Sequence, residues 1–96
     1  MERYFEYHNV KFKKHERGNW AVVRGEITNK SGRDYSSVVF RIIVFKRSIP
    51  ISSVIFALNG FISGQTRLFE KYIEDLDYYK LLQDMTNYEL YAESAY

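Results

Sequence analysis

Residues 35–46 constrain the fold more than any other segment, because their alternation predicts a β-strand that is apolar on both faces. One face carries an apolar side chain at every even position from 38 to 44, and Val39, Ile43 and Phe45 form much of the other. β-Branched and aromatic residues of this kind favour a pleated surface. A strand that is apolar on both sides lies at the centre of a sheet or is covered on its second side.

Shorter stretches of alternation predict further strands along most of the chain. They cover residues 4–14, 19–29, 51–58, 65–74 and 87–95. Between the last two, apolar residues recur at every third position, which predicts a short helix near 75–85. Turn-forming residues separate the strands at 29–34, 46–48, 59–60 and 63–64. Six or seven short strands in 96 residues predict a single all-β domain over 1–96, a sandwich or a barrel.

The composition excludes several kinds of site. The chain contains no cysteine, so it has no disulfide, thiolate nucleophile or cysteine-ligated zinc. Its net charge is only +2, too small by itself to indicate nucleic-acid binding. Residues 1–48 carry eleven Lys or Arg against five Asp or Glu, whereas residues 49–96 carry three against seven. This asymmetry predicts a basic and an acidic edge unless strands from the two halves interleave.

Three segments together resemble the small prokaryotic FxLYD-type immunoglobulin-like domains. They are WAVVRGEITNKS at residues 20–31, YSSV at 35–38 and GQTRLF at 64–69. In that family a V-x-G-x-I/V-x-N-x-S strand leads through a turn to Y-x-x-V, a long apolar strand and a G-Q/T-T/S-x-x-F strand. The resemblance covers roughly residues 18–74. It implies an immunoglobulin-like β-sandwich of six to seven strands and a non-catalytic module of a kind often attached to cell-envelope proteins.

Three residues of these motifs have specific structural tasks. Gly25 is expected to leave room for a neighbouring side chain or a bulge inside a strand. Asn29 is expected to end its strand by hydrogen bonding to the backbone of the following turn. Gly64 is expected to begin a later strand from a backbone conformation that other residues disfavour.

No combination of residues predicts a catalytic or metal site. His8 and His15 would lie on opposite faces of a continuous strand, where they cannot readily share a metal ion. The acidic residues between 70 and 77 lack the glycine and the terminal glutamate of an EF-type calcium loop. The serines belong to neither a Gly-x-Ser-x-Gly elbow nor a Ser-x-x-Lys pair. We therefore expect no enzymatic activity, no cofactor and no metal.

Basic and aromatic side chains are interleaved over residues 4–17 and allow two interpretations. In a small β-barrel, Lys11, Lys13, Lys14 and Arg17 would contact the phosphates of a nucleic acid while aromatic rings stack on its bases. In an edge strand, the lysines would instead prevent pairing with another sheet. The second interpretation is favoured because no RNA-binding motif is present, so nucleic acid is the less expected partner.

Aromatic residues make up 18% of the chain, and alternation divides them into two sets. Those on faces that a sandwich core can use are Phe12, Tyr35, Phe40, Phe56 and Phe69. Those that a core does not need, and that are candidates for a binding surface, are Trp20, Phe45, Tyr78, Tyr79 and Tyr91. Because tyrosine is enriched at protein interfaces, we expect binding of a protein partner or of another copy through an aromatic surface or a strand edge.

The first residues predict no secretory signal. Residues 1–6 include charges but are not followed by an apolar segment of the kind that a signal peptide contains. The longest apolar runs of the chain are far too short to cross a bilayer, so we expect no membrane insertion by this chain itself. It is expected to be cytoplasmic or a soluble domain of a cell-envelope protein.

Overall fold

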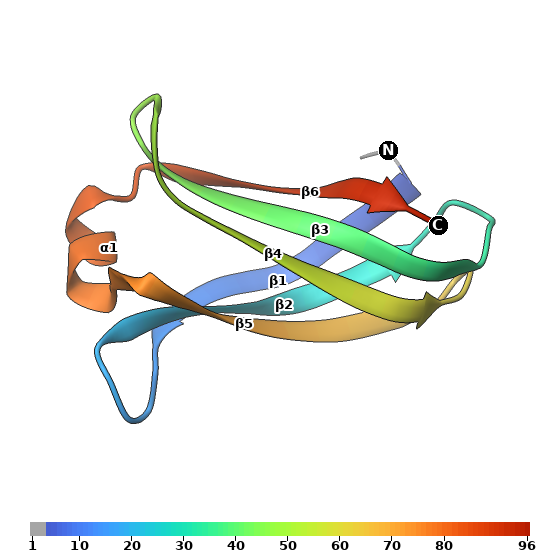
Figure 1. Ribbon diagram of the computed structural model, residues 1–96, viewed down its shortest axis with the longest axis horizontal. Helices are drawn as coiled ribbons and strands as arrows, with labels where there is room; N and C mark the ends of the chain where they lie inside the picture. Colours follow the sequence, from blue (N-terminus) through green and yellow to red (C-terminus); the bar gives the residue numbers. More distant parts are fainter. Residues whose placement is uncertain (1–3) are drawn as a thin grey trace.

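The computed structural model describes residues 4–96, in which six strands form two antiparallel sheets packed face to face (Figure 1). The strands of sheet A, in spatial order, are β1 (Phe5–Lys14), β2 (Trp20–Asn29) and β5 (Thr66–Asp77). Those of sheet B are β4 (Ile49–Phe61), β3 (Tyr35–Lys46) and β6 (Asn87–Ala95). A short helix, α1 (Tyr78–Asp84), connects β5 to β6. The structure confirms an all-β sandwich, and its strands form two separate sheets rather than one closed barrel.

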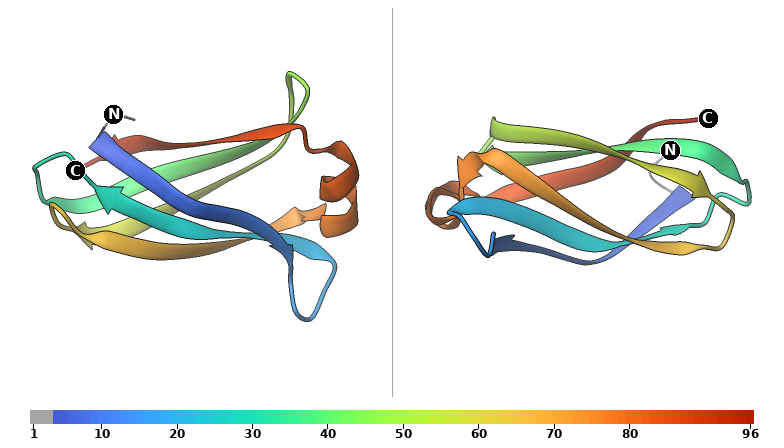
Figure 2. Two further views of the ribbon diagram at one scale, coloured as in Figure 1. Left: turned by 180° about the vertical axis from the view of Figure 1, so that it is seen from behind. Right: turned by 60° about the horizontal axis from the view of Figure 1, so that its bottom comes forward.

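The chain crosses between the two sheets at both ends of the sandwich. At one end residues 30–34 lead from β2 to β3 and residues 62–65 lead from β4 to β5, while α1 makes the third crossing at the opposite end (Figures 1 and 2). Each sheet therefore contains strands from both halves of the sequence. The two halves interleave only in sheet B, where β3 lies between β4 and β6; in sheet A, β1 with its lysines forms one edge and β5 from the acidic half forms the other. Of residues 1–6, which bear on the expectation about a signal peptide, residues 1–3 lie outside the described residues.

β3 occupies the centre of sheet B, which confirms the prediction for a strand that is apolar on both faces. Its inward side chains at 38, 40, 42 and 44 are almost completely buried. Aromatic rings join the two sheets: Phe5 packs edge-on against Phe40 at 5.4 Å, and Phe56 stacks on Phe69 at 4.9 Å between ring centroids. Burial of such a ring contributes roughly 1.5–3 kcal/mol to stability.

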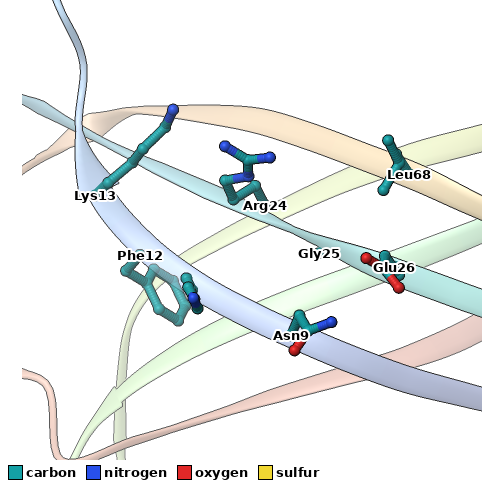
Figure 3. Close-up of a pocket in the computed structure, with 8 residues that line it drawn as sticks. Asn9, Phe12, Lys13, Arg24, Gly25, Glu26 and Leu68 are labelled. Carbon is teal, nitrogen blue, oxygen red and sulfur yellow. The ribbon is translucent and has the colours of Figure 1, made fainter.

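A bulge in β1 explains the glycine at position 25. Asn9 and Val10 both lie opposite Gly25. Asn9, which is labelled beside Gly25 in Figure 3, adopts a φ of 54°. A Cβ atom on Gly25 would stand 3.0 Å from the Phe69 ring and 3.1 Å from Val10 Cγ2. Any larger residue would overpack this contact. The expectation that Gly25 leaves room beside a bulge is confirmed.

The turn after β4 comes later than the Asn59-Gly60 pair predicts. β4 continues to Phe61, because the Phe61 side chain is completely buried in the core. Gly60 has a φ of 63° inside the end of the strand, and the chain turns over residues 62–65. Gly64, with a φ of 81°, lies in this turn just before β5, as its predicted task requires.

The helix is shorter than the predicted segment 75–85. Asp77 caps its N-terminus by accepting hydrogen bonds from the backbone N–H groups of Tyr79 and Lys80. Residues up to Asp77 belong to β5. The helix buries Leu81, whereas Leu82 is 61% exposed, so the three-residue spacing indicated the wrong leucine.

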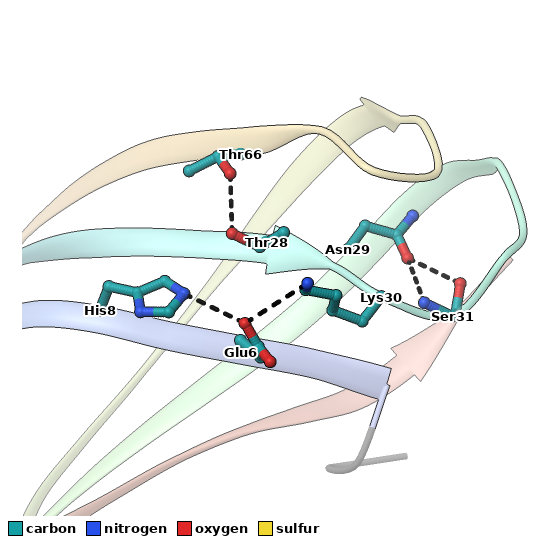
Figure 4. A network of polar contacts seen from close by, with 7 residues as sticks. All are labelled: Glu6, His8, Thr28, Asn29, Lys30, Ser31 and Thr66. Atoms are coloured by element: carbon teal, nitrogen blue, oxygen red, sulfur yellow. Dashed lines mark hydrogen bonds and ion pairs between the residues drawn. The ribbon is translucent and has the colours of Figure 1, made fainter.

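Asn29 joins the two connections that cross between the sheets at one end. Its Nδ2 donates to the carbonyl oxygens of Arg33 at 2.8 Å and Phe61 at 3.1 Å. Its Oδ1 accepts from the backbone N–H of Ser31 at 3.0 Å and from the Ser31 hydroxyl at 2.7 Å (Figure 4). Its own backbone N–H donates to Gln65, and its carbonyl accepts from Gly64. The expectation that Asn29 ends β2 by bonding to the turn is confirmed.

Replacing Asn29 with Ala is expected to lower the free energy of unfolding by about 2–4 kcal/mol, because several buried polar groups lose their partners together. Urea titration followed by circular dichroism measures this loss. Asn59→Ala, at an exposed position, serves as the control and is expected to change the free energy of unfolding by less than about 0.5 kcal/mol. Equal losses in the two variants would contradict the role assigned to Asn29.

Candidate functional site

The outer face of sheet B, here named face B, is the candidate binding surface. It is formed by the outward side chains of the central strand β3 and those directly opposite them on β4 and β6. Its apolar members are Val39, Ile43, Phe45, Ile55, Ala57 and Tyr91. The helix α1 packs against β2 and β5 of the other sheet. Within residues 4–96 no helix or strand covers face B.

A charged pair lies in the middle of these apolar side chains. Arg41 Nε donates to Glu93 Oε1 at 2.7 Å, and Arg41 Nη2 donates to Glu93 Oε2 at 3.3 Å. Arg41 Nη1 donates to the Ser53 hydroxyl at 2.8 Å, so one side chain links all three strands of the sheet. The hydrogen bonds to Glu93 raise the pKa of Arg41 above its ordinary value, and the guanidinium stays charged.

An irregularity in β6 places Glu93 within reach of this arginine. Val39 pairs with Ser94 and Phe40 pairs with Ala92, which leaves Glu93 as the extra residue of a bulge. Its carboxylate can then make the two-point contact with a guanidinium that gives such pairs their geometric specificity. Face B thus combines apolar side chains with a fixed, internally neutralised charged pair, and Ser53 and Glu89 flank Ile43 on the same face.

The structure distributes the five predicted aromatic residues over three places. Phe45 and Tyr91 lie on face B, Phe45 on β3 opposite Asn87 and Tyr91 on β6 opposite Arg41. Trp20 lies on sheet A, at the start of β2. Tyr78 and Tyr79 begin α1, where their rings meet edge-on at 5.8 Å. The five residues therefore do not form one surface.

Trp20 belongs to a small aromatic cluster on the outside of sheet A. Its ring stacks on His15 at 4.4 Å, and His15 meets Tyr72 edge-on at 4.7 Å. The ring also covers Gly18, where a Cβ atom would collide with it. The indole Nε1 is buried and has no hydrogen-bond partner in the described part of the chain. Trp20 packs the β1–β2 hairpin and offers only part of its surface to a ligand.

The two helix tyrosines differ in their burial. Tyr78 is partly buried against the core, whereas Tyr79 is 54% exposed. The remaining apolar members of face B, Val39, Ile43, Ile55 and Ala57, are aliphatic and were not among the predicted site residues. The alternation of residues 35–46 could have identified Val39 and Ile43, because it places both on the face opposite the core side chains.

The predicted basic residues are also separated by the fold. Lys11 and Lys13 line a shallow groove of about 610 Å³ on the outside of sheet A, together with Arg24 and the backbone of Gly25 (Figure 3). Lys14 instead donates to the carbonyls of His15 and Gly18 and stabilises the hairpin turn. Arg17 lies in that turn, outside the groove.

Acidic residues partly neutralise this groove. Lys13 Nζ lies 3.5 Å from Glu70 Oε1, and Glu26 also lines the groove. Lys11 and Arg24 make no ion pair with any carboxylate of residues 4–96. The groove therefore carries a small excess of positive charge, which comes from Lys11 and Arg24.

No set of three or more histidine, aspartate or glutamate side chains among residues 4–96 is arranged to hold a metal ion. His8 lies 3.4 Å from Glu6, which also approaches Lys30, while His15 packs on Trp20 (Figure 4). No helix in the described part of the chain is long and apolar enough to cross a membrane.

Comparisons with protein-family models, with curated proteins and with solved structures find no match to this chain.

The Arg41–Glu93 pair is expected to stabilise sheet B, and a double-mutant cycle with Arg41→Ala and Glu93→Ala measures this coupling. The loss of stability in the double variant is expected to be smaller than the sum of the two single losses, by an amount that falls at high ionic strength. Urea titration at low and high salt gives both quantities. The same cycle on Lys13 and Glu70, which approach only to 3.5 Å, should show weaker coupling; equal coupling would contradict the special geometry of the first pair.

Proposed function

We propose that this chain is a non-catalytic interaction module, an immunoglobulin-like β-sandwich that binds another protein through face B. The observation that carries the proposal is a central strand with apolar side chains on its outer face and no covering element within residues 4–96. Apolar groups that meet water cost free energy, and contiguous exposed patches of them mark interaction sites.

The chemistry of face B suits a protein partner. Protein interfaces are enriched in tyrosine, phenylalanine and arginine in their buried centre, and face B contains Phe45, Tyr91 and Arg41. Glu93 and Ser53 already satisfy the guanidinium of Arg41. A partner therefore covers this charge without having to supply a counterion of its own, which reduces the cost of desolvation.

The resemblance of residues 18–74 to FxLYD-type immunoglobulin-like domains supports the same proposal, since it implies a module without catalytic activity. On that resemblance the natural setting is a cell-envelope protein, with the cytoplasm as the alternative compartment.

Replacing Ile43 with Lys is expected to abolish binding of the partner, because it adds a charge to the middle of face B. The fold should tolerate this change, since the new ammonium group stands directly opposite Glu89 across the β3–β6 pair. The measurement is retention of proteins from an extract of the source cells on immobilised wild-type and variant protein.

Leu82→Lys, at an exposed position on α1, is the matched control for this experiment and should retain the same partner as the wild type. Loss of the partner in both variants, or in Leu82→Lys alone, would place the binding surface elsewhere. A protein retained equally by all three forms would also contradict the role of face B.

The groove on sheet A supports a second candidate function, the binding of a polyanion such as a nucleic acid. Lys11 and Arg24 lie together in the groove, and neither forms an ion pair with a carboxylate of the described residues. This favours polyanion binding over the alternative in which the lysines only prevent β1 from pairing with another sheet. The shallow shape and the nearby Glu26 and Glu70 limit the strength of such binding. This function ranks below protein binding.

Replacing Lys11 and Arg24 together with Ala is expected to weaken binding of a labelled single-stranded oligonucleotide, and to reduce the salt dependence of that binding by about two phosphate contacts. Fluorescence anisotropy over a series of salt concentrations measures both effects. Lys14→Ala is the control, because this lysine is engaged by the hairpin backbone. Absence of binding by the wild type at low salt would eliminate this second function.

A further inference from the structure

Three of the four sheet edges carry features that oppose pairing with another strand. β1 has three lysines and a bulge. β5 has several charged residues, of which Arg67 and Lys71 face inward. β6 has two glutamates and a bulge. Charges and bulges of this kind are the usual protection of edge strands. β4 is different: none of its thirteen residues is charged.

Two features confine the open part of β4 to its middle. At its beginning, Pro50 and a bulge opposite Phe45 interrupt regular pairing. Near its end, Arg67 Nη1 donates to the carbonyl oxygen of Asn59 at 3.0 Å. Between them lie residues 52–58, whose central residue, Ile55, is 49% exposed. At the beginning of this stretch Ser52 is buried, and its hydroxyl donates to Asp75 Oδ1 of β5 at 2.9 Å.

The contact with Arg67 also shows which backbone groups of β4 point outward. Arg67 belongs to sheet A, so the Asn59 carbonyl that it binds points away from β3. In an antiparallel pair, successive residues direct their N–H and C=O groups alternately toward and away from the neighbouring strand. The pairing with β3 is regular from Ser52 to Leu58. The backbone groups of Ser53, Ile55 and Ala57 therefore point to the free edge.

From this geometry we propose that β4 pairs with β4 of a second copy of the chain, antiparallel and about a twofold axis at Ile55. Ile55 then exchanges both of its backbone hydrogen bonds with Ile55 of the second copy. Ser53 lies opposite Ala57 of the second copy, and Ala57 opposite its Ser53. The pairing uses the open edge between the two blocked ends, and it goes beyond the binding of another protein at face B.

The absence of charged residues from β4 favours a second copy of the chain as the occupant. Any charged residue near a twofold axis would meet its own equivalent, and like charges opposite one another destabilise a sheet. β4 itself brings none, and the nearest cation on face B, Arg41, is neutralised by its own Glu93. The Asp75 carboxylate of β5 contacts β4 at Ser52, three residues from the axis, and not at Ile55. The two Arg41 side chains would be three strand spacings apart, roughly 14 Å, where salt screens their repulsion.

A twofold pairing also closes the assembly. Each copy uses its single uncharged edge, and the remaining edges of the dimer are the protected ones, so no further copies are added. The two sheets B become one six-stranded sheet, and the two faces B become a continuous surface. The partner of face B then meets a dimeric platform.

Sedimentation velocity over a range of protein concentrations tests the proposal. The wild type is expected to change reversibly from monomer to dimer as its concentration rises. Ile55→Glu places two carboxylates at the axis and is expected to raise the dissociation constant at least about tenfold. Leu68→Glu, on the outer face of sheet A and 70% exposed, is expected to leave it unchanged. A wild type that stays monomeric throughout, or equal effects of the two variants, would overturn the proposal.

Cysteine cross-linking tests the register without depending on a destabilised variant. Because the chain contains no cysteine, Ile55→Cys can form only a disulfide between copies. Opposite residues in a hydrogen-bonded pair have Cα atoms about 5.5 Å apart, within the range that a disulfide bridges. Mild oxidation is expected to give a covalent dimer with Ile55→Cys and not with Leu68→Cys. Equal cross-linking of both, or none at position 55, would contradict the axis.

Ile43→Lys separates this proposal from the one about face B. Ile43 lies on the central strand β3, away from the open edge, so this variant should form dimers like the wild type while losing the partner. A monomeric wild type that still retains a partner through face B would refute the dimer alone. A dimer that retains no partner would refute the proposed function alone.

Discussion

The two connections that cross between the sheets at one end are joined by one buried residue, Asn29, through its side-chain amide and its backbone. The chain leaves sheet A after β2 and returns to it before β5 at the same end of the sandwich. The side-chain amide of Asn29 bonds to the first connection at Ser31 and Arg33 and to the end of β4 at Phe61. The backbone of Asn29 bonds to the second connection at Gln65 and Gly64. A sandwich without a disulfide has no covalent tie between its layers, so this network supplements the aromatic core.

Face B depends on that frame, because a surface can bind specifically only if its strands are fixed. The central strand β3 is held on both sides, and the contact of Arg41 with Glu93 and Ser53 ties the three strands together on the outside. The core residues of β3 hold the same strand from the inside. An interface on such a sheet loses little conformational entropy when a partner binds, and this favours affinity.

The sequence was sufficient to predict the strands, the central position of β3 and the tasks of Gly25, Asn29 and Gly64, because alternation and backbone chemistry are local. It was less informative wherever tertiary contacts decide. Because the Phe61 side chain is buried in the core, β4 continues beyond Asn59-Gly60, a pair that favours turns. Arg67 and Lys71 face inward because β5 is an edge strand of its sheet. The candidate site was predicted in part: Phe45 and Tyr91 share face B, but Trp20, Tyr78 and Tyr79 lie elsewhere. Which outward residues of separate strands meet depends on strand order, which alternation does not reveal.

The position of Trp20 determines what the intrinsic fluorescence of this protein reports. It is the only tryptophan, and it lies against His15 and Gly18 at the end of the β1–β2 hairpin rather than in the core between the sheets. Its emission therefore follows the packing of that hairpin, whereas circular dichroism follows both sheets. The separation between the two unfolding curves measures how independently this end of the sandwich opens.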